Sequence, residues 1–408
     1  MDVDQLKKSG VIYTPIIIVL FTFFIPISPT LKSIFLWLSI VPIILNPYFR
    51  RLSYRYTWQS IWCLSAVALF TFIAISSLWS PASNSLQFGV IIKYVKILYI
   101  PVLAVAFINR KYRLWSLNAY LAAAVLTCIL SILKARGWLS IGHTADQGAI
   151  FLNHIFTGFV VSFASYLAGL FFFQTKGWLR VIYLIILLLT SYQLIFINTG
   201  RTGYVLYIAL MIMLFLQKLS LKQAILGVVL VFSLFVLSYN VSIMTHLKLK
   251  EVINDVVLYQ QNNKSTSLGL RIEFQQYAQS LLVQHPMFGV GAGGFEHLFY
   301  QSSPVPNWGK KLTDPHSQYW LILAEQGIIG FMLLLFFFVN LFITALKLKE
   351  TKPILLGFLC IFFIGCLSDS ILCYSIAGYL LVLFSALSFG ELIEVGEAQR
   401  PLKDRVLV

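Results

Sequence analysis

Two arginines lie where their side chains could bind an anionic group. Arg201 lies in INTGRTGY, where flanking glycines permit a sharp turn and the close approach of a ligand to backbone N–H groups. Arg271 lies in SLGLRIEFQQY, at the start of an expected helix. Guanidinium groups present planar forks of donors that suit the several charged oxygens of a pyrophosphate. The alternatives are an Arg201 that reaches lipid phosphate, and an Arg271 that pairs with Glu273 or Glu251.

His316 adds a group that can move a proton. It lies in TDPHSQYWLILAEQGIIG, at the junction of a polar loop and an apolar run. An imidazole at such a boundary can accept a proton from a hydroxyl near neutral pH. The alternative is a histidine that caps a helix or faces lipid. His285 and His297 lie in the same loop, but the spacings of 12 and 19 residues match no familiar ligand pattern, so we predict no metal.

Three further residues could extend this site. Lys93 and Lys96 form an i, i+3 pair near the outer end of an apolar run, and could add to a cationic pocket for phosphate. The same lysines could instead reach the outer lipid headgroups. Asp369 lies at the turn between the last two apolar runs, where it could orient an arginine or His316. Its alternative is a solvated turn residue.

Membrane helices must position these residues, because the composition excludes a soluble fold. The 408 residues are 59% hydrophobic and 11% charged, whereas soluble domains carry about 25% charged residues. Lipid offers no partners to the backbone, and the continuous apolar runs lack the alternation of barrel strands. We therefore predict an all-α polytopic membrane protein with about 12 transmembrane helices. The expected runs are 11–29, 31–46, 60–79, 88–108, 115–134, 149–174, 180–199, 203–217, 223–242, 317–345, 353–369 and 371–388.

The basic residues between these runs predict the orientation of the chain. The net charge of +15 is spread over small clusters between apolar runs, which is typical of topology signals and argues against nucleic-acid binding. With both termini placed in the cytoplasm, the inner connections hold 18 Lys and Arg and the short outer ones hold four. The inner set is Lys7, Lys8, Arg50, Arg51, Arg55, Arg110, Lys111, Arg113, Lys176, Arg180, Lys218, Lys222, Lys347, Lys349, Lys352, Arg400, Lys403 and Arg405, and the outer set is Lys32, Lys134, Arg136 and Arg201.

One connection is long enough to form a structure of its own. It contains the expected helix from Arg271 to Val283 and the Pro- and Gly-rich stretch HPMFGVGAGGF, so we predict a folded cap on the outer face. The predicted organisation is transmembrane helices 1–9 in residues 1–242, the cap in 243–315, helices 10–12 in 316–390 and a cytoplasmic tail in 391–408.

The unusual polar residues gather at one surface. Nearly all of them lie at the predicted outer face, and none forms a chain across the bilayer. A transporter would place its site near the midplane, often with broken helices and repeat symmetry. The pattern instead favours an enzyme that acts on a lipid-borne anion at the outer face.

Four stretches resemble the bacterial O-antigen ligase and polymerase superfamily of integral membrane glycosyltransferases. They are LWSPASNSL, TGRTGY, LRIEFQQYAQSLLVQHPMFGVGAGGF and HSQYWLILAEQGIIG. The last is similar to the family's histidine–x–x–tyrosine and glutamate–x–glycine signature. With the twelve expected helices and the late outer loop, the resemblance covers most of the chain.

The resemblance implies a membrane-embedded, GT-C-like glycosyltransferase of the bacterial inner membrane with its active site in the periplasm. The donor would be a glycan on undecaprenyl pyrophosphate, and the acceptor of a ligase would be a sugar hydroxyl of the lipid A-core. By the same resemblance, Arg201 and Arg271 would hold the pyrophosphate, and His316 would be the essential histidine. The reaction would need no metal or other cofactor, and a single displacement would invert the anomeric centre.

Alternatives within and outside the superfamily stay open. The O-antigen polymerase and the protein O-oligosaccharyltransferase use the same donor, and the single large late loop favours the ligase. A polytopic transporter is the alternative of another class. A double displacement would need a carboxylate nucleophile, for which Glu296 and Asp314 are candidates.

Overall fold

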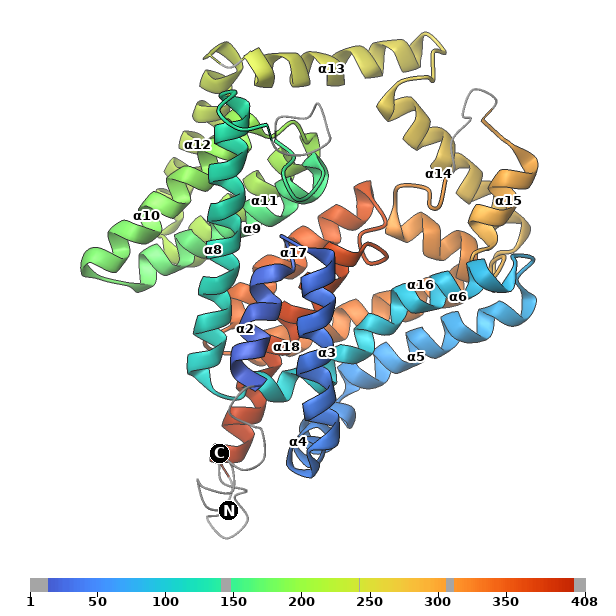
Figure 1. Cartoon of the computed structure of the whole chain (residues 1–408). Helices are drawn as coiled ribbons and strands as arrows, with labels where there is room; N and C mark the ends of the chain where they lie inside the picture. Colours follow the sequence, from blue (N-terminus) through green and yellow to red (C-terminus); the bar gives the residue numbers. More distant parts are fainter. Residues whose placement is uncertain (1–13, 141–147, 242, 306–311, 400–408) are drawn as a thin grey trace.

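The computed structural model describes residues 14–140, 148–241, 243–305 and 312–399, and within them every regular element is a helix (Figure 1). The α-helices are α2 (Thr14–Phe24), α3 (Pro29–Leu45), α4 (Pro47–Ser53), α5 (Ile61–Ile75), α6 (Asn84–Val95), α7 (Tyr99–Leu103), α8 (Arg110–Ala135), α9 (His154–Gln174), α10 (Gly177–Tyr192), α11 (Arg201–Lys218), α12 (Leu221–Val241), α13 (Ile243–Gln260), α14 (Ser267–Gln284), α15 (Gly294–Ser302), α16 (Gln318–Lys347), α17 (Lys352–Ser368) and α18 (Ser375–Ala398). Short 3-10 or π segments adjoin them: η1 (Tyr54–Trp58), η2 (Ser76–Trp79), η3 (Lys96–Leu98), η4 (Ala104–Phe107) and η5 (Gln193–Ile197).

The predicted class of multi-span helical membrane protein is confirmed, but the predicted number of spans is not. Helices are present in all twelve apolar runs, of which residues 11–13 and 242 lie outside the described part. Eight described helices are long and apolar enough to cross a membrane, or nine if the pair Pro29–Leu45 and Pro47–Trp58, bent by 93°, is one span. The 17-residue α17 is shorter than that. Twelve spans therefore stay a prediction.

Two helices form the centre of the molecule. Buried residues make up 89% of the most apolar window of α9 and 83% of that of α18, against 28% in the α10 span and 17% in α12. Phe163 of α9 packs its ring against Phe358 of α17 and Phe384 of α18. The helices with exposed apolar faces are those that lipid would cover, since lipid does not penalise exposed leucine or phenylalanine.

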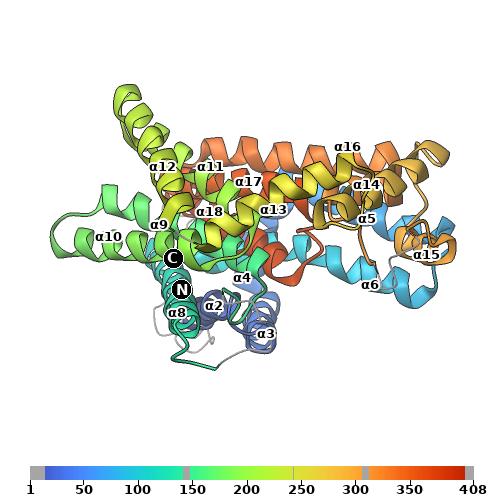
Figure 2. The ribbon, with the colours of Figure 1, turned by 90° about the horizontal axis from the view of Figure 1, so that it is seen from above.

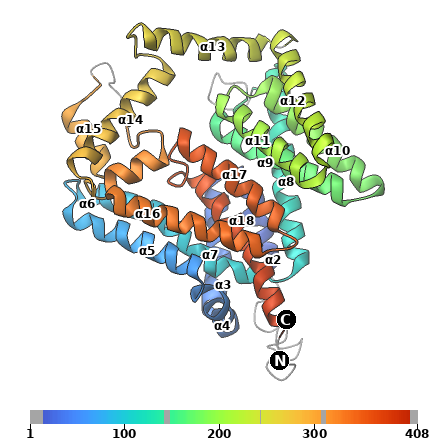
Figure 3. The same cartoon turned by 180° about the vertical axis from the view of Figure 1, so that it is seen from behind.

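The long connection between α12 and α16 contains the helices α13, α14 and α15. α13 extends from α12 across to α14 (Figures 1 and 3), and α14 lies over α16 when the molecule is seen from above (Figure 2). A second hydrophobic core joins this connection to the first turns of α16. Its buried members are Phe274, Ala278, Leu281, Val290, Phe295, Phe299, Leu312, Leu321 and Ala324.

The helical backbone of α16 is interrupted at Gly327, and the loop after α14 supplies hydrogen-bond partners to the backbone groups on both sides of the interruption. Gly327 has φ 65° and ψ −164°, which takes the backbone out of the helix. The loop N–H groups of Val290 and Gly291 donate to the carbonyls of residues 324 and 325 at 3.0 and 2.7 Å. In return, the N–H groups of residues 328 and 329 donate to the carbonyls of residues 286 and 287 at 2.8 and 3.2 Å. This exchange fixes the HPMFGVGAGGF stretch on α16.

α16 and α17 form an antiparallel hairpin that brings two predicted site residues together. α16 begins two residues after His316, and α17 ends at the residue before Asp369. The N–H of Gln318 donates to the carbonyl of Asp369 at 3.2 Å. At the other end, the carboxylate of Glu391 accepts N–H groups of residues 349, 350 and 351 at 2.7, 3.0 and 2.8 Å. α18 thus continues past the expected tail boundary at 391, to Ala398.

Candidate active site

His316 lies in a turn that holds its backbone in a left-handed conformation. Its φ is +52°, which costs a residue with a side chain about 1 kcal/mol or more. The Oδ1 atom of Asp314 accepts the N–H of His316 at 3.0 Å, so the aspartate two residues earlier closes the turn. Pro315 between them restricts the backbone further. The sequence DPH therefore fixes the backbone conformation from which the imidazole of His316 extends.

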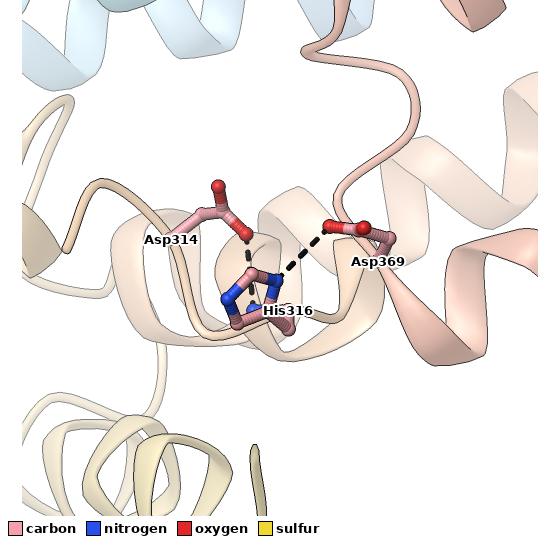
Figure 4. A group of neighbouring side chains, drawn as sticks. All are labelled: Asp314, His316 and Asp369. Carbon is pink, nitrogen blue, oxygen red and sulfur yellow. Dashed lines mark hydrogen bonds and ion pairs between the residues drawn. The ribbon is translucent and has the colours of Figure 1, made fainter. Parts of the chain in front are cut away.

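The carboxylate of Asp369 contacts one nitrogen of the His316 ring. The Nδ1 atom of His316 lies 3.3 Å from the Oδ1 atom of Asp369 (Figure 4). The Asp369 side chain is 4% exposed, whereas that of His316 is 28% exposed. The N–H of Ser370 also donates to the same carboxylate oxygen, at 3.0 Å. A buried carboxylate thus fixes a ring that still reaches the surface.

A tyrosine on the same turn completes the group. The hydroxyl of Tyr374 donates to Asp314 Oδ2 at 3.2 Å. Burial, together with the carboxylates of Asp314 and Asp369, raises the pKa of Tyr374 well above its usual range, so the phenol stays protonated and acts as a donor. Asp314 is therefore held at both oxygens, by the His316 backbone and by Tyr374.

The arrangement suits proton transfer at the second ring nitrogen. With Nδ1–H donated to Asp369, Nε2 of His316 carries the free lone pair and can accept a proton from a bound hydroxyl. The carboxylate also stabilises the imidazolium that such a transfer would form. Phe274 of α14 packs on this ring, with 6.0 Å between the centroids. The imidazole is thus fixed by an aspartate and an aromatic ring, and partly shielded from water.

The same three side chains could also hold a metal ion. One ligand atom each from Asp314, His316 and Asp369 lie within 4.8 Å of one another, and this is the one such group found in the described part of the chain. The protein itself already occupies these ligand atoms, because both Asp314 oxygens and Oδ1 of Asp369 accept hydrogen bonds. His285 and His297 do not join the group.

Arg271 lies on the helix face that covers His316. It is half-buried in the first turns of α14, three residues before Phe274. Residues three apart share one side of a helix, so Arg271 lies on the side of α14 that carries Phe274, which packs on His316. Of its two expected alternative partners, Glu273 pairs with Lys264 at 2.6 Å.

Arg201 begins α11 and pairs with the cap. Its Nη1 atom lies 2.9 Å from Oδ2 of Asp255 on α13, with side-chain exposures of 32% and 13%. The neighbouring glycines serve helix packing: a Cβ on Gly200 would meet the carbonyl oxygen of His154 at 2.7 Å, and Gly203 contacts Gly158 of α9. Arg201 is thus fixed at the end of α11 beneath α13. Within the part of the chain that the structure describes, its ion-pair partner is Asp255 and not a residue of the His316 group.

The two lysines have separate surroundings. Lys96 is 3% exposed, and its ammonium donates to the carbonyls of residues 372, 373 and 374 at 3.0, 3.3 and 3.1 Å. It therefore anchors the turn that carries Asp369. Lys93 is half-buried on α6, and its charge interacts with the buried carboxyl of Glu325.

The comparisons with known proteins assign this region to a family. Residues 184–335 match the O-antigen ligase family model, a segment of 152 of the 408 residues. It runs from α10 through the cap into α16 and includes Arg201, Arg271 and His316. Residues 184–335 are thus similar to the O-antigen ligase family. Members of this family are glycosyltransferase-like ligases and polymerases.

A second comparison reaches only a short part of the chain. An uncharacterized protein of Haemophilus influenzae is 30% identical over 86 residues. The match covers 20% of this chain and 22% of that protein. The resemblance to the O-antigen ligase and polymerase superfamily is thus confirmed by the family model, and the relative adds similarity over about a fifth of each chain.

Four residues with contacts in the candidate site are not indicated as site residues by the sequence. Asp314 was considered only as a nucleophile, although its place two residues before His316, across a proline, is a turn signal. Tyr374 and Phe274 read as ordinary aromatic residues among many. Asp255 lies in a polar stretch with nothing to connect it to Arg201 54 residues earlier.

Proposed function

We propose that the chain is an O-antigen ligase of the bacterial inner membrane. It transfers a glycan from undecaprenyl pyrophosphate to a sugar hydroxyl of the lipid A-core, on the periplasmic side. The observation that carries the proposal is the His316–Asp369 contact at 3.3 Å, whose histidine lies in the segment 184–335 that matches the O-antigen ligase family. A histidine whose Nδ1 atom is fixed by a carboxylate is suited to removing a proton from a hydroxyl with its Nε2 atom.

In the proposed reaction, Nε2 of His316 accepts the proton of the acceptor hydroxyl as its oxygen attacks the anomeric carbon. The bond from that carbon to the pyrophosphate oxygen breaks, and both electrons leave with the undecaprenyl pyrophosphate. A single displacement inverts the anomeric centre. Arg201 and Arg271 stabilise the charge on the leaving pyrophosphate, which speeds the reaction only to the extent that they bind the transition state more tightly than the donor.

The ion pair of Arg201 with Asp255 fits this role. A guanidinium has five N–H donors, and one contact with Asp255 at 2.9 Å leaves others for phosphate oxygens. The carboxylate on α13 then fixes the direction of the guanidinium before the donor binds. In the proposal, Arg271 would contact the pyrophosphate from α14, on the side of Phe274.

The donor requirement of the arginines is tested with Arg201→Lys, which keeps the charge but loses the planar fork. We expect turnover of a lipid-linked donor to fall on the order of 10²-fold. Arg136→Lys is the matched control, because Arg136 is exposed and bonds only weakly to Tyr192 at 3.3 Å. Full activity of Arg201→Lys would remove the bidentate role.

The assignment to ligase is tested by deleting the gene in a strain of known surface glycan. Loss of a ligase leaves bare core, while long polymer accumulates on the carrier lipid. Core capped by one repeat would instead indicate a polymerase. Normal lipopolysaccharide with unglycosylated periplasmic proteins would indicate a protein O-oligosaccharyltransferase, and unchanged glycans with altered uptake of a solute would indicate a transporter.

The proposal is of a metal-independent reaction, so a chelator should leave turnover of the purified protein unchanged. Loss of activity in a chelator, restored by a divalent cation, would assign Asp314, His316 and Asp369 to a metal site.

A further inference from the structure

A cavity of about 740 Å³ lies at the end of the molecule opposite His316. It is bordered by the start of α8, the end of α9, the end of α11 and the connection from α16 to α17. α16 has 30 residues, so its length of roughly 40 Å separates the cavity from the His316 turn. The proposed glycan transfer uses no residue of this cavity. We propose that it binds the headgroup of an anionic phospholipid.

The cavity has an excess of positive charge. Its charged lining residues are four cations, Arg110, Lys218, Lys349 and Lys352, and one anion, Glu350. Glu350 is already neutralised, because Arg110 contacts its Oε1 at 2.5 Å and the buried Arg113 behind it contacts its Oε2 at 3.4 Å. Among the described residues, no acidic side chain pairs with the three lysines.

The apolar wall favours a lipid over a free anion. Leu114, Phe171 and Leu356 line the same cavity as the lysines. A phospholipid presents a phosphate next to acyl chains, and this pairing matches cations that border an apolar wall between membrane helices. Inorganic phosphate would use the lysines and leave the apolar wall in contact with water.

The proposal is tested on the full-length protein in micelles that contain phosphatidylcholine and increasing fractions of phosphatidylglycerol. The midpoint of thermal unfolding should rise with phosphatidylglycerol, because a ligand that binds the folded state stabilises it. Combining Lys218→Gln, Lys349→Gln and Lys352→Gln should raise the half-saturating lipid fraction roughly 100-fold, since each lysine contributes about a fivefold factor. The matched control combines Lys176→Gln, Lys222→Gln and Lys347→Gln, which remove the same charge outside the cavity.

The outcomes separate the lipid from other ligands. A response lost in the cavity variant and kept in the control variant supports the site. Equal responses in both variants overturn it, as does an equal effect of phosphatidylcholine. Stabilisation by inorganic phosphate alone, at matched ionic strength and with no further gain from phosphatidylglycerol, overturns a lipid ligand. If the triple variant does not fold, the exposed Lys349→Gln alone should shift half-saturation about fivefold, and no shift would overturn the proposal.

Discussion

The chemistry of a histidine depends on which of its two ring nitrogens forms a hydrogen bond with the protein. In this site Asp369 approaches Nδ1 of His316 at 3.3 Å, and the aspartate is almost fully buried while the ring is not. Asp314 holds the backbone of the same histidine at 3.0 Å. Two carboxylates therefore have different tasks at one imidazole: one fixes the ring and the other fixes the turn.

His316 is best tested with two substitutions that separate backbone from ring. We expect His316→Asn to lower turnover by 10²-fold or more, on the order of what a general base contributes. Asparagine tolerates a positive φ such as +52°, so the turn should persist and the unfolding midpoint should stay near that of the parent. His316→Ala should lose as much activity and more stability. Normal turnover in either variant would remove the proton-transfer role.

Asp369→Asn tests whether the carboxylate sets the tautomer of His316. The amide has nearly the same shape, but can donate to Nδ1 and so favour the wrong tautomer. We expect kcat to fall on the order of 10²-fold with little change in KM, measured on a lipid-linked donor. Glu273→Gln is the control, since it removes a carboxylate that pairs with Lys264 and should leave the tautomer of His316 unchanged. A rise in KM of similar size, with kcat unchanged, would instead indicate that Asp369 contributes to binding.

At this scale the sequence predicted that Asp369 could orient His316, and the two side chains are in contact; it did not predict the contacts of Asp314, Tyr374 and Phe274 in the same group. His316 and Asp369 stand out because each is an ionisable residue at the edge of an apolar run. Lys96 is also an ionisable residue at the edge of an apolar run, and the sequence indicates a phosphate pocket for it. Its ammonium instead donates to three carbonyls of the turn after Asp369. A spacing pattern shows that a charge lies at a membrane edge, and only tertiary contacts show its partner.

Among the elements, α16 departs most from what periodicity predicts. Its apolar run is interrupted only by Glu325 and Gln326 before Gly327, and this short polar step gives no signal of a break unless the facing segment is known. The break at Gly327 depends on backbone hydrogen bonds with residues 286–291, which are about 40 positions earlier in the chain. The signature glutamate–x–glycine and the Gly-rich stretch were each visible in the sequence, but their pairing was not.

Gly327→Ala should disrupt this junction. The alanine would have to adopt φ 65°, with its Cβ 2.4 Å from the carbonyl oxygen of Met287. We expect a loss of at least about 2 kcal/mol in stability, seen as a lower unfolding midpoint in micelles. Gly89→Ala on α6 is the control, because a Cβ there meets nothing within 4 Å and alanine favours the helix. Equal midpoints for the two variants would contradict the role of the junction.

For the whole molecule, composition and charge predicted the helical membrane class, and periodicity placed a helix in every apolar run. The number of spans was not predictable in this way, because a run of apolar residues does not show where a helix bends. Asn46 ends α3 and caps α4, with Pro47 at the first helical position, and the chain turns by 93° there. The basic residues Lys7, Lys8, Arg400, Lys403 and Arg405 lie outside the described residues.

The predicted orientation is tested with single cysteines and a membrane-impermeant maleimide. Tyr300→Cys, on the exposed side of α15, should react in cells with an intact inner membrane. Lys349→Cys, in the turn from α16 to α17, should react only after that membrane is disrupted. The parent chain supplies the background, since its five cysteines are buried or half-buried. The reverse labelling pattern would invert the topology.

The relative orientation of α16 and α17 determines the distance between His316 and Asp369. The imidazole sits at the tip of one helix and its carboxylate at the tip of the other, while Glu391 clamps the turn at their base. Over the roughly 25 Å of α17, a tilt of about 5° at the clamp would move its tip by about 2 Å, enough to part the pair. Substitutions at this base, one helix length from the pair, should therefore change turnover while leaving every side chain that meets the sugar intact.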